Sequence, residues 1–72
     1  MTREEFLTQM LDVLQREDEL TFDMELQDVE EWDSLSIMAT MAFLKKQFGV
    51  ETGLADYKAM KTVEDIAAKA GL

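Results

Sequence analysis

Ser34 is the residue whose type and position best suit covalent chemistry. It stands in the run Glu31-Trp32-Asp33-Ser34-Leu35-Ser36, directly before a segment with helical apolar spacing. Asp33 is a preferred helix N-cap, so Ser34 is predicted at the first helical position. Free backbone N–H groups and the positive end of the helix dipole gather there, and both stabilise a phosphate ester. Because Asp and Ser are also common at simple helix starts, the dipeptide alone does not decide between a modification site and a cap.

Other chemistry is restricted by composition, since the chain contains neither histidine nor cysteine. It therefore cannot assemble a thiolate nucleophile, an imidazole base or a zinc site, and it forms no disulfide. Four carboxylates before Ser34 are suited to a divalent cation but lack the glycine and spacing of an EF-hand loop; they belong to Asp28, Glu30, Glu31 and Asp33. We predict no metal site. A chain of 72 residues buries only about 60% of its unfolded surface, so we predict one domain, residues 1–72, without catalytic activity.

The chain is strongly acidic, with sixteen acidic and seven basic residues and a net charge of −9. Besides solubility, this charge favours a partner with a basic docking surface, reached by electrostatic steering. It excludes nucleic acid, whose phosphates need clustered lysine and arginine, and it disfavours an anionic membrane. No apolar run approaches the ~20 residues of a membrane span, and no apolar signal core follows the first methionine. We expect a cytoplasmic monomer.

Helical periodicity dominates the chain, and no strand alternation is convincing. We predict helices over residues 2–16, 34–48, 53–57 and 62–70. Capping residues mark their ends: Thr2 with Glu5, Asp33, Gly49, Thr62 with Asp65, and Gly71. The loop of residues 17–33 is long, and loops of this length are often functional. Its alternating apolar residues leave open a short extended stretch. The fold class is therefore all-α, a small four-helix bundle with three main helices, one short helix and a long first loop.

The predicted second helix has two apolar faces in helical projection. The face assigned to the core holds Ile37, Met38, Met41, Leu44 and Phe48. The face assigned to the surface holds Leu35, Ala39, Ala42 and Phe43. Because an exposed apolar patch often marks a docking site, we predict that this second face meets partner enzymes. The alternative is that Phe43 belongs to the core, and its burial distinguishes the two.

The whole pattern resembles the acyl carrier protein family, whose mark is Asp-Ser-Leu at the start of the second helix, here Asp33-Ser34-Leu35. The resemblance covers nearly the whole chain, because Phe48-Gly49-Val50 and Thr62-Val63-Glu64-Asp65-Ile66 follow in the family's order. It implies that Ser34 carries 4′-phosphopantetheine derived from coenzyme A, with Asp33 and Leu35 framing the site. The arm ends in a thiol that holds cargo as a thioester, and a chain without cysteine offers no competing thiol.

The resemblance also implies partners and a role. The partners are a phosphopantetheinyl transferase, an acyl- or aminoacyl-loading ligase, and downstream acyltransferase or synthase enzymes. Carriers of fatty acid biosynthesis resemble one another in having acids along the second helix, where this chain has Ser36, Ala39, Lys45 and Lys46. The resemblance therefore favours a free-standing, non-catalytic carrier of acyl intermediates in a specialised lipid or polyketide-type pathway.

Two alternative functions and one question about the interior stay open. The first alternative is an aminoacyl, D-alanyl or peptidyl carrier, since tryptophan before Asp-Ser also looks like that group. The second is a helical interaction module that is never modified. Five methionines available to the interior either let the core open for an acyl chain or, as we favour, simply fill it; they are Met10, Met24, Met38, Met41 and Met60.

Overall fold

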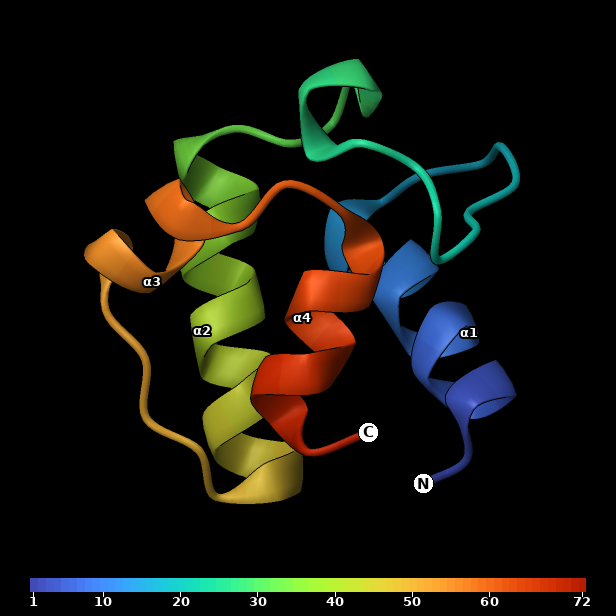
Figure 1. Cartoon of the computed structure of the whole chain (residues 1–72). Coiled ribbons are helices and arrows are strands. Elements are labelled where there is room, and N and C mark those ends of the chain that lie inside the picture. Colours follow the sequence, from blue (N-terminus) through green and yellow to red (C-terminus); the bar gives the residue numbers. More distant parts are fainter.

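The computed structural model describes all residues from 1 to 72, and it confirms the all-α fold class. Its helices are α1 (Arg3–Leu14), α2 (Ser34–Phe48), α3 (Leu54–Ala59) and α4 (Val63–Ala70), with one 3-10 turn, η1 (Leu26–Asp28), in the long loop. Helix α1 packs against α2, and in the view of Figure 1 α4 appears between these two helices, with the short α3 on the far side of α2. The chain termini lie close together, because Arg3 Nη1 donates to the Leu72 carbonyl across 3.1 Å.

The helix ends follow the capping residues. Capping boxes open three helices, at Thr2 with Glu5, Asp33 with Ser36, and Thr62 with Asp65. Gly49 and Gly71 end α2 and α4 at φ 69° and 91°, left-handed conformations that favour glycine. The predicted bounds of α2 are therefore confirmed, and α4 begins at Val63 with Thr62 as its N-cap and ends at the predicted Ala70. Helix α1 stops at Leu14, earlier than the predicted Arg16, because Gln15 takes the left-handed conformation.

An aromatic cluster centred on Phe6 fills the interior. The Phe6 ring lies 6.0 to 6.3 Å from the rings of Phe22, Phe43 and Phe48, so α1, the long loop and α2 meet at one point. Met10, Leu44, Val63 and Ile66 are fully buried around this cluster. The short α3 contributes one buried residue, Tyr57. Burial of this apolar surface is the main driving force for the fold.

The predicted faces of α2 are partly wrong. Phe43, assigned to the surface, is only 9% exposed, whereas Met38, assigned to the core, is 61% exposed. The buried side of the helix also includes Ser36 and Thr40. Their hydroxyls bond to the backbone one turn back, at Asp33 O and Ser36 O, so burying them leaves no polar group unpaired. A helical projection based on hydrophobicity places such polar residues toward water. For this reason the predicted core face of α2 was turned about the helix axis relative to the buried face in the structure.

The long loop is held onto the bundle along most of its length. Leu20, Leu26 and Val29 are buried. Three backbone hydrogen bonds tie the loop to the segment that opens α4: Leu26 N–H to Lys61 O, Val63 N–H to Met24 O, and Glu64 N–H to Phe22 O, at 2.8 to 3.1 Å. A single bridge pairs Glu25 with Thr62, which is the extended stretch that the alternating residues left open. The loop therefore reaches Ser34 along a fixed path.

Candidate functional site

Ser34 opens α2 in a rigid and exposed position. Asp33, the N-cap, accepts the Ser36 N–H through its carboxylate at 2.9 Å. Ser36 completes the box, because its hydroxyl accepts the Asp33 N–H at 2.8 Å and donates to the Asp33 carbonyl. These bonds fix the backbone on both sides of Ser34, whose own side chain is exposed. The predicted placement at the first helical position is confirmed.

The hydroxyl and the local backbone are free to receive an anionic group. The Ser34 hydroxyl takes part in none of the side-chain hydrogen bonds of the helix start, and the N–H groups of Ser34 and Leu35 have no acceptor within the chain. These N–H groups lie at the N-terminus of α2, where the helix dipole is positive. A phosphate ester on Ser34 would thus meet two unpaired donors, as anions at helix N-termini do.

Two contacts hold the segment before Ser34 in place, one from the end of α1 and one from α3. Arg16, just past the end of α1, donates Nη1 to Glu31 Oε1 at 2.7 Å and Nε to the Glu19 carbonyl at 3.1 Å. This hydrogen bond from Arg16 holds the pKa of Glu31 below its usual range. On the other side, the half-buried Trp32 packs against Tyr57, with ring centroids 6.1 Å apart. The sequence prediction missed the Arg16–Glu31 pair, although a lone basic residue before a loop whose charged residues are all acidic was a signal for it.

The whole net charge of the protein lies in the loop that leads to Ser34. Residues 17–33, called the acidic loop below, hold nine of the sixteen acidic residues and no basic one. The other seven acidic residues balance the seven basic residues. A positively charged partner is therefore attracted to this loop rather than to the molecule as a whole.

The exposed apolar surface of α2 forms a continuous stripe beside Ser34. Its members are Leu35, Met38, Ala39 and Ala42, which recur at one face of a helix. Leu35 is 76% exposed, so the stripe is well developed at the end next to Ser34. Met38 was missed because it was assigned to the core, although its spacing of three from Leu35 carried the signal. Phe43 does not belong to the stripe, because it packs on Phe6 and Phe48.

The carboxylates before Ser34 do not form a metal-ligating group. Nowhere in the structure do three acidic side chains come close enough together to hold a metal ion. Glu31 is paired with Arg16, and the Asp33 carboxylate caps α2.

None of the helices is long and apolar enough to cross a membrane.

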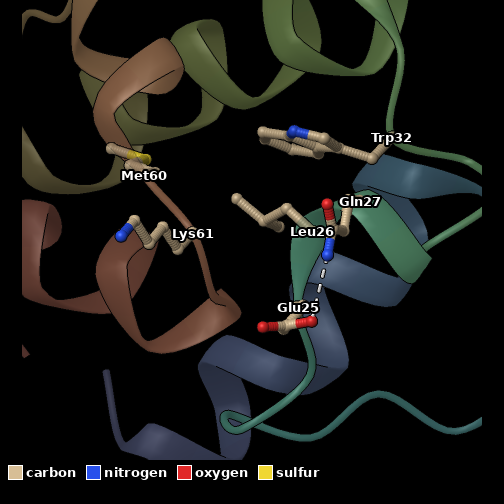
Figure 2. Close-up of a pocket in the computed structure, with 6 residues that line it drawn as sticks. All are labelled: Glu25, Leu26, Gln27, Trp32, Met60 and Lys61. Carbon is tan, nitrogen blue, oxygen red and sulfur yellow. Dashed lines mark hydrogen bonds between the residues drawn. The ribbon is translucent and has the colours of Figure 1, made fainter.

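Two surface grooves flank the start of α2. The first, called the Trp32 groove, has a volume of about 460 Å³ and is lined by Glu25, Leu26, Gln27, Trp32, Met60 and Lys61 (Figure 2). The second, called the α1–α2 groove, has a volume of about 500 Å³ and includes Val13, Glu31, Asp33, Leu35 and Ala39. Ser34 lines neither groove, but Asp33 and Leu35 beside it line the second and Trp32, two residues earlier, lines the first.

Comparison with known proteins identifies the family. The family model for the phosphopantetheine attachment site matches residues 4–69, nearly the whole chain. The chain belongs to this family. Its members are carrier domains that bind a covalently attached 4′-phosphopantetheine group and work with a phosphopantetheinyl transferase and partner enzymes. The searches of curated proteins and of solved structures returned no significant match.

The residues at the start of α2 fit this cofactor. It is joined to the protein as a phosphodiester, which needs an accessible hydroxyl and donors for the phosphate oxygens. The exposed Ser34 offers such a hydroxyl, and the N–H groups of Ser34 and Leu35 are unpaired. When bound, the cofactor supplies a thiol that holds cargo as a thioester.

Proposed function

We propose that this protein is a non-catalytic carrier whose phosphopantetheine arm is attached to Ser34. The observation that carries the proposal is the unpaired, exposed Ser34 hydroxyl at the first position of α2, in a chain that belongs to the phosphopantetheine-attachment family. In the modification, the Ser34 hydroxyl loses its proton and takes the phosphopantetheine moiety of coenzyme A, with release of adenosine 3′,5′-bisphosphate. Asp33 positions Ser34 by capping the start of α2.

Partner enzymes recognise two surfaces beside Ser34. The stripe of Leu35, Met38, Ala39 and Ala42 supplies apolar contact, and Met38 takes the place first given to Phe43. The acidic loop supplies the electrostatic attraction, since it holds all of the net charge. Complementary charge raises the rate of encounter more than the final affinity. The partners are thus enzymes that present a basic rim around an apolar contact.

The carrier delivers acyl intermediates to enzymes of a specialised lipid or polyketide-type pathway rather than to fatty acid biosynthesis. This part of the proposal is supported by α2, whose exposed side carries Ala39, Lys45 and Lys46 instead of acidic residues. An enzyme that recognises acidic residues along α2 would not find them there, because the net negative charge of this protein lies in the acidic loop. An aminoacyl carrier is the second candidate, and the polar rim of the Trp32 groove favours it.

The proposal is tested by incubating the purified protein with coenzyme A and a phosphopantetheinyl transferase of broad specificity. Intact mass spectrometry should show the gain of one phosphopantetheine in the native chain and none in Ser34→Ala. Circular dichroism of both proteins checks that they are folded. If the folded native chain gains no mass while a control carrier does, the unmodified interaction module replaces this proposal.

A further inference from the structure

An arm attached to Ser34 can place its cargo either inside the helical core or against the surface, and Tyr57 bears directly on this choice. Tyr57 is the buried residue of α3 and is only 3% exposed. Its hydroxyl hydrogen-bonds the Thr52 hydroxyl at 2.8 Å, and its ring packs against Trp32. Displacing Tyr57 to admit a chain beneath α3 would break this bond and leave a buried phenol unpaired, which is unfavourable. Tyr57 therefore closes the core on the side of α3.

The rest of the interior is also occupied by buried side chains. Phe6 contacts three other aromatic rings, and Met10 and Leu44 are fully buried beside it. The hollows that exist are open grooves on the surface. Well-packed cores respond to added volume with strain, so a long alkyl chain has no ready place inside.

The Trp32 groove lies within easy reach of the attachment site. Trp32 precedes Ser34 by two residues, so their Cα atoms are no more than about 7 Å apart. The groove is built from two segments, the acidic loop around η1 and the connection between α3 and α4. Figure 2 shows the Trp32 ring over Leu26, with Met60 and Lys61 across the hollow. An arm leaving Ser34 can therefore turn back along Trp32.

The lining of the groove matches a polar arm with a short cargo. Trp32, Leu26 and Met60 form an apolar wall, while Glu25, Gln27 and Lys61 form a polar rim. The Gln27 amide donates to Glu25 Oε2 at 3.1 Å, which holds the carboxylate at the rim. The two amides and the dimethyl group of a pantetheine arm find both kinds of partner here. A long alkyl chain, in contrast, would lie against a carboxylate and an ammonium group and desolvate them.

On the basis of attachment at Ser34, we infer that the Trp32 groove binds the phosphopantetheine arm outside the helical core, and that the cargo is a short acyl group bearing a polar or charged substituent. The α1–α2 groove is less suited, because its lining contains the carboxylates of Glu31 and Asp33 and no basic side chain. Glu25 is the rim group that meets a cationic substituent, such as the amino group of an aminoacyl cargo.

The test uses two methionines as matched reporters, Met10 in the core and Met60 in the groove. The protein is loaded by the transferase with the arm alone, a β-alanyl arm or a dodecanoyl arm, and mass spectrometry verifies each product. Methyl NMR of the methionines and the indole N–H signal of Trp32 are then recorded. Attachment of the arm is expected to shift the Met60 and Trp32 signals and to leave Met10 unchanged. The dodecanoyl load should move neither Met10 nor the melting temperature.

The variants Glu25→Gln and Glu17→Gln test the polar rim, since both change an exposed acid but only the first lies in the groove. The further shift caused by β-alanyl loading should be lost in Glu25→Gln and kept in Glu17→Gln. Unchanged Met60 and Trp32 signals on a verified holo protein would overturn this inference alone. A Met10 shift with a rising melting temperature after dodecanoyl loading would place the cargo in the core and overturn it as well. Failure to gain the arm at all would overturn the proposed function together with it.

Discussion

Arg16, which directly precedes the acidic loop, is hydrogen-bonded to Glu31 near the end of that loop, with Arg16 Nη1 donating to Glu31 Oε1 across 2.7 Å. The two residues are fifteen positions apart, and both side chains are mostly shielded from solvent. The bond therefore fixes the segment that carries Trp32 and Asp33 into Ser34. It is the contact through which the end of α1 positions the proposed modification site.

Replacing Glu31 with glutamine should make stability less dependent on pH. The hydrogen bond from Arg16 lowers the pKa of Glu31 in the folded protein, from an ordinary value near 4.5. As the pH falls, the unfolded chain takes up the proton first, so the stabilisation is complete above the ordinary pKa and is lost as the pH falls through the lowered one. Urea unfolding should show a stability difference between native and Glu31→Gln proteins at pH 7 that shrinks by pH 3. An equal difference at both pH values would contradict the role of the ionised pair.

Phe43→Ala should destabilise the fold strongly, because Phe43 is part of the aromatic cluster around Phe6. Loss of a buried phenylalanine costs about 3–5 kcal/mol, measurable by urea unfolding. Phe43→Leu keeps most of the volume and serves as the milder comparison if the alanine variant does not fold. A loss of partner binding without loss of stability in either variant would restore Phe43 to the docking surface.

Leu35→Ala and Met38→Ala should behave in the opposite way. Both side chains are exposed, so each substitution should change the free energy of unfolding by only about 0.5 kcal/mol or less. Because they lie in the exposed stripe that we propose as the docking surface, each should raise the KM of the transferase several-fold. Leu54→Ala is the matched control, since Leu54 is 55% exposed but lies on α3, outside the stripe. An equal rise in KM for Leu54→Ala would show that exposed apolar area, not the stripe, is recognised.

Asp33→Ala should weaken the start of α2, because its carboxylate caps the Ser36 N–H. Loss of such a cap costs about 1 kcal/mol, and the loosened helix start should also slow modification of Ser34. Asp33→Asn keeps a capping oxygen and should recover most of the stability. If the asparagine variant is stable yet still slow to be modified, Asp33 contributes its charge to the reaction rather than its cap alone.

The parts of the fold governed by local sequence were predictable. Asp33 and Gly49 gave both ends of α2, because capping depends on residues within one turn. The buried side of α2 was not predictable from hydrophobicity, since Thr40 is fully buried with its hydroxyl bonded to the Ser36 carbonyl. The Arg16–Glu31 contact depends on how the loop returns across the bundle, which no local pattern encodes. The position of Ser34 at the first turn of α2 was predictable because the capping residue Asp33 precedes it directly.

Attachment of the arm at Ser34 is tested most directly by peptide-level mass spectrometry of the protein after reaction with coenzyme A and a phosphopantetheinyl transferase. Ser34 and Ser36 are the two serines of the chain, so Ser34→Ala and Ser36→Ala form a matched pair. We expect one phosphopantetheine on Ser34, absent from Ser34→Ala and retained in Ser36→Ala once folding of both is verified. Modification that persists in Ser34→Ala, or none on the folded native chain while a control carrier reacts, would contradict it.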